Sequence, residues 1–202
     1  MLAKVASHYG RGPVVAIDPH NSPILLDQSG DADASSYKEF LKAIHSNGVS
    51  DCVEPHVAYS TDVAKSCNRP IRILWIDGDH ILEGVNADVA GFLRFVVPNG
   101  VVAFHDSLNA FSGPIQVFVR QFLDSDQFGP AGFVHSIAWA QYRPDDGSRF
   151  RKQRLKLRRA ASRLIPFVEK DEDLHGIRKR LYKFNRFRVP HWASLRKLGA
   201  RV

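Results

Sequence analysis

Apolar residues along the chain follow two patterns, which alternate. Short continuous runs occupy residues 13–17, 71–76 and 101–104, and runs of this length are typical of strands buried on both faces. Between the runs, apolar residues recur every three or four positions, as they do on one face of a helix. The alternation predicts an α/β fold, a Rossmann-like and mostly parallel sheet with helices on both faces.

The helical stretches have recognisable ends. Residues 35–48 carry apolar side chains at helical spacing, with serines at the start and Gly48 at the end. Residues 82–97 carry an apolar stripe that reaches Val96 and stops before Pro98-Asn99-Gly100. The remaining predictions are a weak strand at 53–58, a short helix at 61–66, a helix at 113–125 and a closing strand at 134–142.

Charge divides the chain into two parts. Residues 1–143 contain 10 Lys/Arg and 15 Asp/Glu, whereas residues 144–202 contain 18 Lys/Arg and 6 Asp/Glu. We therefore predict a main domain at 1–143 and a basic helical extension at 144–202, with helices at 149–165 and 174–187. Such an extension either packs on the domain with a solvated basic face or binds an anionic partner: a membrane surface, nucleic acid or a phosphorylated glycan. We favour packing.

Cysteine content and hydropathy suggest a compartment. Cys52 and Cys67 are the two cysteines of the sequence, which is too few for a disulfide framework and fits a reducing environment. No apolar stretch approaches the length of a membrane span, and residues 1–10 lack the apolar region of a signal peptide. We predict a cytoplasmic protein.

Acidic residues follow three predicted strands. Asp18, Asp77 and Asp106 each come at or just after the end of an apolar run, and each has a histidine within three residues. One such aspartate is commonly a helix cap or a turn former. Three of them, at strand ends that open α/β sheets use for ligands, favour a binding or catalytic site.

The side chains at these ends suit two kinds of chemistry. Carboxylates a strand apart can hold a hard divalent cation such as Mg²⁺, which prefers oxygen ligands. His80 and His105 can act as a general base near neutral pH, or they can simply hydrogen-bond to the carboxylates.

The order of these motifs resembles that of a known family. The segments AIDPH, RPIRILWIDGDHILEGVNADV and PNGVVAFHDS are similar to those of class I S-adenosylmethionine-dependent methyltransferases, in particular small-molecule and sugar O-methyltransferases. The resemblance covers about residues 3–142 and is densest at 69–107. It implies O-methylation of a sugar or small metabolite, with metal assistance in some relatives.

The resemblance also implies roles for individual residues. Asp18 would accept hydrogen bonds from the ribose of S-adenosylmethionine, and Ser60 and Thr61 would contact its adenine. Asp77 would lie beside the methionine part of the cofactor and, with Asp106, would bind Mg²⁺ or another divalent cation. His80 would be the general base that deprotonates the acceptor hydroxyl. Catechol-type relatives place an amide ligand directly after the second aspartate, where this chain has Ser107.

The sequence departs from the family at its front. The family's first strand, in the middle of the sheet, and its glycine-rich turn have no counterpart here, and Gly10 and Gly12 instead precede the strand that ends at Asp18. We therefore expect a methyltransferase domain truncated at its N-terminus, with poor or no S-adenosylmethionine binding by these 202 residues.

Two other classes of protein stay open. One is a methyltransferase-like domain that has lost catalysis and acts as a binding module. The other is a metal-dependent phosphoesterase, which would need more histidine and aspartate ligands than two strand ends supply. The partners that fit the preferred interpretation are a small-molecule or glycan acceptor, an anionic surface at the basic extension and a second copy of the chain.

Overall fold

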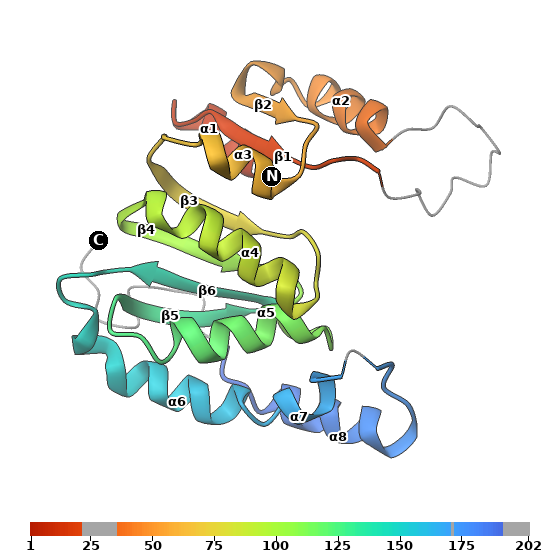
Figure 1. Ribbon diagram of the computed structural model, residues 1–202, viewed down its shortest axis with the longest axis vertical. Coiled ribbons are helices and arrows are strands. Elements are labelled where there is room, and N and C mark those ends of the chain that lie inside the picture. Colours follow the sequence, from red (N-terminus) through yellow and green to blue (C-terminus); the bar gives the residue numbers. More distant parts are fainter. Residues whose placement is uncertain (22–35, 171, 192–202) are drawn as a thin grey trace. The chain divides into compact units, whose positions relative to one another are not determined.

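The computed structural model describes residues 1–21, 36–170 and 172–191 (Figure 1). The chain divides into two compact units, residues 1–67 and residues 68–202. Most of the loop predicted after the first strand, residues 22–35, lies outside the described residues.

In its described residues, the first unit contains a two-stranded parallel sheet and three α-helices. β1 pairs with β2 from Val14 opposite Val53 to Ile17 opposite His56. Among the described residues of this unit, the buried apolar side chains are Val49 and Ala64. The elements are α1 (Leu2–His8), β1 (Val14–Ile17), α2 (Ser36–Ser46), β2 (Val53–His56) and α3 (Ser60–Ser66).

The second unit is built on a four-stranded sheet with the order β3-β4-β6-β5. β3 and β4 are parallel, and β6 is antiparallel to both of its neighbours. β3, β4 and β5 therefore point in one direction, and the predicted α/β fold with a mostly parallel sheet is confirmed. The strands are β3 (Ile71–Ile76), β4 (Val96–Phe104), β5 (Phe128–Val134) and β6 (Ile137–Tyr142). The helices are α4 (Leu82–Phe92), α5 (Ser112–Val117), α6 (Arg151–Ala161), α7 (Ile165–Val168) and α8 (Gly176–Phe187).

The core of this unit lies between the sheet and α5. Figure 1 shows α4 and α5 side by side along the sheet. Phe104 at the end of β4 packs against Phe118 and Phe122, with ring centroids 5.9 and 4.8 Å apart. All three side chains are fully buried, and each such phenylalanine stabilises the fold by about 1.5–3 kcal/mol. This core holds the ends of β3 and β4 in fixed positions.

The basic extension packs against the same core. Leu157, Ala161 and Leu164 are fully buried members of it, which confirms the prediction that the extension packs. The side-chain amide of Gln153 pairs with both backbone groups of Ala131: it accepts from the Ala131 N–H at 3.2 Å and donates to the Ala131 carbonyl. Because β5 is an edge strand, this pairing covers part of an edge that would otherwise be open.

Arg154 connects α6 to the turns around β5 by hydrogen bonds. Its side chain is fully buried, and it donates to the carbonyls of Phe128 and Gly147 and to Asp126 Oδ1, the last at 2.9 Å. Burial lowers the pKa of Arg154, while Asp126 opposes that shift. These contacts join residues on both sides of the compositional boundary at 143/144, and all of them belong to the second compact unit.

The structure corrects three details of the prediction. Val96 does not extend the helix of residues 82–97; α4 ends at Phe92, and Val96 opens β4 opposite Ile71. The strand β5 was not predicted, because glycine and proline interrupt its apolar pattern. The helix predicted at 113–125 is α5 followed by a π-helical turn over Phe118–Phe122.

Candidate functional site

Parallel pairing brings the ends of β3 and β4 together. The last ladder pair is Ile76 opposite Phe104, and the His105 N–H donates to the Ile76 carbonyl at 2.9 Å, one residue beyond it. Asp77 and His105 are therefore neighbours at the carboxyl edge of the sheet, and Asp106 follows directly.

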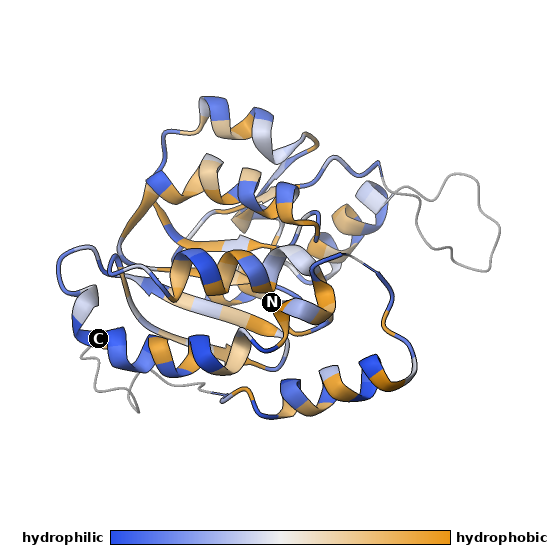
Figure 2. Ribbon diagram, turned by 60° about the horizontal axis from the view of Figure 1, so that its bottom comes forward, coloured by the Kyte–Doolittle hydropathy of each residue, from blue (hydrophilic) through white to orange (hydrophobic). Residues whose placement is uncertain are grey.

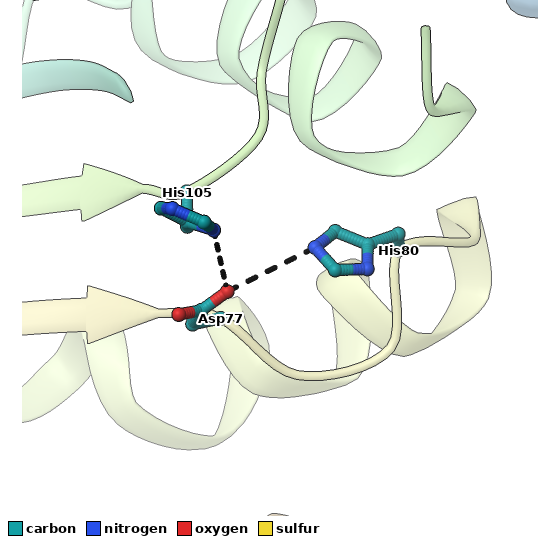
Figure 3. A group of neighbouring side chains, drawn as sticks. All are labelled: Asp77, His80 and His105. Carbon is teal, nitrogen blue, oxygen red and sulfur yellow. Dashed lines mark ion pairs between the residues drawn. The ribbon is translucent and has the colours of Figure 1, made fainter. Parts of the chain in front are cut away.

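The side chains at this edge converge on one point (Figure 3). Asp77 Oδ1 lies 2.8 Å from His105 Nδ1 and 3.9 Å from His80 Nε2. His80 Nε2 lies 3.8 Å from Asp106 Oδ2, and His105 Nδ1 lies 3.4 Å from Asp106 Oδ1. The structure thus brings together Asp77, His80 and Asp106, and it places His105, the second histidine considered from the sequence, against both carboxylates.

The loop that carries His80 is fixed by its neighbours. The His80 ring stacks on Phe111, with centroids 4.4 Å apart, and the His80 carbonyl accepts from the Gly113 N–H at 2.9 Å. A Cβ at position 113 would lie 2.7 Å from the His80 carbonyl oxygen and 2.4 Å from that of Ile81. Only glycine allows this approach, which holds the His80 loop against the first turn of α5.

Asp106 is held in an uncommon backbone conformation. Its φ is 51°, in the left-handed region that non-glycine residues enter infrequently and often at functional sites. The Asn109 amide donates to Asp106 Oδ1 at 2.6 Å, whereas the buried Ser107 hydroxyl donates to the Phe104 carbonyl at 3.1 Å. The amide beside this aspartate therefore comes from Asn109, a residue that sequence reasoning missed.

The arrangement fits a bound cation. One donor atom from each of Asp77, His80 and His105 lies within 4.8 Å of the others. His80 Nε2 and His105 Nδ1 are buried atoms, and neither makes a hydrogen bond of good geometry. Buried polar atoms without a hydrogen bond usually have a partner in the working protein. Imidazole nitrogens and carboxylate oxygens together are suitable ligands for divalent metal ions.

The other predicted residues lie in the first unit. The Asp18 N–H donates to the His56 carbonyl at 3.1 Å, and Asp18 Oδ1 accepts from the His20 N–H at 2.7 Å. Ser60 and Thr61 form the first turn of α3. Their predicted role, and that of Asp77, in cofactor binding stays a prediction.

A Rossmann-like α/β fold with acids and histidines at the carboxyl edge of its sheet defines a ligand-binding or catalytic domain of the α/β class. A family model described as a methyltransferase domain matches residues 1–107, more than half of the sequence. The chain belongs to this methyltransferase domain family, as its motifs predicted. No curated protein matches it.

Solved structures show weaker similarities. The methyltransferase MycE from the mycinamycin biosynthetic pathway, in complex with Mg, SAH and mycinamycin VI, is 16% identical with a TM-score of 0.46. The match covers 71% of this chain and 40% of MycE. The apo structure of CalS11, a TDP-rhamnose 3′-O-methyltransferase of calicheamicin biosynthesis, is 15% identical with a TM-score of 0.48, over 69% of this chain and 64% of CalS11. The chain thus spans less than two thirds of either protein.

Within the described parts of the chain, every helix is too short or too polar to cross a bilayer.

Proposed function

We propose that this domain transfers a methyl group from S-adenosylmethionine to a hydroxyl oxygen of a sugar or other small metabolite, assisted by a divalent cation. The observation that carries the proposal is the convergence of His80 on Asp77 and Asp106 at the carboxyl edge of the sheet. Membership of the methyltransferase domain family supports the reaction type.

His80 is the residue proposed to move the proton. Bound S-adenosylmethionine supplies an electrophilic methyl group on a sulfonium sulfur. The acceptor hydroxyl gives its proton to His80 Nε2, its oxygen forms the new bond to the methyl carbon, and the carbon–sulfur bond breaks. Stacking on Phe111 and the backbone contact to Gly113 fix the imidazole before the acceptor arrives, and fixed placement is a main source of catalytic rate.

The cation would be held by Asp77 and Asp106, with His105 as an added nitrogen ligand. A divalent ion there would lower the pKa of a coordinated acceptor hydroxyl. His80 belongs to the same cluster of possible ligands and lies 3.8–3.9 Å from both carboxylates. This proposal assigns its Nε2 to the acceptor proton and not to the metal, with Asp106 completing the ligand set in its place. Asp18, Ser60, Thr61 and Asp77 are proposed to bind the cofactor.

The proposal is tested by incubating the chain with S-adenosylmethionine, Mg²⁺ or Mn²⁺, and each member of a panel of hydroxyl acceptors. The panel includes free sugars, nucleotide sugars and catechols. The expected result is methylation of an acceptor at high S-adenosylmethionine concentration, because these 202 residues are predicted to bind the methyl donor poorly. His80→Ala should lower turnover by about 10²–10⁴-fold, the usual contribution of a general base, with S-adenosylmethionine affinity unchanged. The matched control is His45→Ala, at an exposed histidine of α2, which should leave turnover unchanged.

The alternatives give different results in the same samples. Metal-dependent hydrolysis of a phosphate ester without S-adenosylmethionine would indicate the phosphoesterase. Absence of S-adenosylmethionine binding, also with the coding region upstream of Met1 included, would indicate the binding module. Equal turnover by His80→Ala and the unmodified chain would remove His80 from the mechanism.

A further inference from the structure

In the part of the chain that the structure describes, helix α8 exposes several large apolar side chains. Ile177, Leu181, Phe184 and Phe187 are 74%, 46%, 55% and 88% exposed. The first three are spaced four and three residues apart, so they lie along one side of the helix, with Phe187 one turn beyond. We call these four residues the apolar stripe. Figure 2 shows the resulting alternation of hydrophobic and hydrophilic bands along the helix.

The stripe lies among mostly basic residues, although Glu172 and Asp173 precede α8 and Glu172 pairs with Arg178 at 3.3 Å. The sequence of α8, GIRKRLYKFNRF, and that of α6, RKQRLKLRRAA, contain no acidic residue. A groove of about 600 Å³ runs along α6 to the end of α8. We call it the basic groove; it is lined by Lys152, Leu155, Lys156, Arg159, Ala160, Arg163, Arg188 and Pro190.

Arg188 joins the apolar stripe to the basic groove. It lines the groove, and its guanidinium lies 4.6 Å from the centre of the Phe184 ring. The two features therefore form one continuous surface, apolar along α8 and cationic along α6.

The opposite side of α8 is firmly attached to the unit. Tyr182 is buried in the core, and its hydroxyl accepts a hydrogen bond from the Ala110 N–H at 2.9 Å. Burial raises the pKa of Tyr182, so the hydroxyl stays neutral. With this side packed, the apolar stripe stays directed outward. Ala110 precedes Phe111, which stacks on His80, so the anchor of α8 adjoins the loop of the candidate site.

We propose that the apolar stripe and the basic groove bind the surface of an anionic lipid membrane. A helix with a cationic face and a row of aliphatic and aromatic side chains lies in the interface, with the apolar side chains among the acyl chains and the cations at the headgroups. A nucleic acid would be attracted by the cations, but it gives no apolar environment for Ile177 and Leu181. The proposal is independent of methyl transfer.

Co-sedimentation with vesicles tests it on the full chain. The chain should sediment with vesicles of phosphatidylcholine mixed with phosphatidylglycerol, and not with phosphatidylcholine alone. Phe184→Ser with Phe187→Ser, which leaves the net charge unchanged, should weaken binding by about tenfold or more, because apolar burial is lost. Lys179→Gln with Lys183→Gln should weaken it by a similar factor and reduce its salt dependence. The controls are Tyr9→Ser and Lys42→Gln, at exposed positions of the first unit, and neither should change binding.

Because all the substituted side chains are exposed, the variants should fold, and thermal melting checks this. Three results would overturn the proposal. The first is absence of binding to anionic vesicles. The second is undiminished vesicle binding by the Phe184/Phe187 variant, which would show a purely electrostatic surface. The third is binding to single-stranded RNA that is tighter than binding to the vesicles and insensitive to the loss of both phenylalanines, which would identify a nucleic-acid site.

Discussion

The two units carry the same sequence pattern, a strand followed by an aspartate and a histidine, with different results. In the first unit, Asp18 is 64% exposed in its side chain and is contacted by its near neighbour His20. In the second, Asp106 is 19% exposed and lies within 3.8 Å of two histidines. This difference reflects the position of the hydrophobic core. The buried phenylalanines of the core lie in the second unit, where they hold the ends of β3 and β4 in place. A pattern of residues becomes an organised site only where packing holds the backbone that carries it.

The largest effect should come from breaking the packing of the second unit at Arg154. Arg154→Met would leave the Phe128 and Gly147 carbonyls and Asp126 without their buried donor. Loss of one partner from a buried charged network typically costs about 3–5 kcal/mol. Chemical denaturation measures the loss, and hydrogen exchange should localise it to β5 and α6. Arg163→Met, at an exposed position of the same extension, should stay within about 0.5 kcal/mol of the unmodified chain. An equal cost for both would mean that the Arg154 network does not support the unit.

A smaller effect is expected from acid, which acts on the same network. Hydrogen bonding to Arg151, with further attraction from Arg154, lowers the pKa of the Asp126 carboxyl below its ordinary value of 3.8. A carboxylate with a lowered folded-state pKa stabilises the fold above the unfolded pKa, and that stability is lost as pH falls through the folded pKa. Stability of the second unit should therefore decline below about pH 4. In Asp126→Asn, the melting temperature should fall less steeply as the pH is lowered below about 4. If the variant and the unmodified chain lose stability equally at low pH, other carboxyl groups cause the decline.

Much of the fold follows from local sequence. The continuous apolar run at 71–76 is β3 itself, because a short apolar run of this length favours a strand. Burial on both faces, as the run predicted, is not observed: Ile76 is buried, whereas Ile73 is 55% exposed. The strand β5 could not be predicted from Phe128–Val134, which contains Gly129, Pro130 and Gly132. Proline is tolerated there because β5 is an edge strand with a register shift between Phe128 and Ala131. Its edge is covered by Gln153, a contact over 22 residues that no local pattern shows.

The candidate site, like the fold, could be predicted only in part from the sequence. Asp77 and Asp106 could be predicted, because parallel strands end at one edge and the acids follow those ends directly. The Asn109 amide and the stacking of Phe111 on His80 could not, because both depend on the turn that places Asp106 at a φ of 51°. The direction of His105 toward Asp77 likewise depends on its backbone hydrogen bond to Ile76.

Calorimetric titration with Mn²⁺ tests most directly whether the second unit holds an organised site. We expect the chain to bind Mn²⁺ at a single site. His105→Ala and Asp77→Asn should each weaken this binding by at least about tenfold, whereas His80→Ala should retain it, because His80 is proposed as the base and not as a ligand. The result that would contradict the account is equal Mn²⁺ affinity in the unmodified chain, His105→Ala and Asp77→Asn, or no binding by any of them.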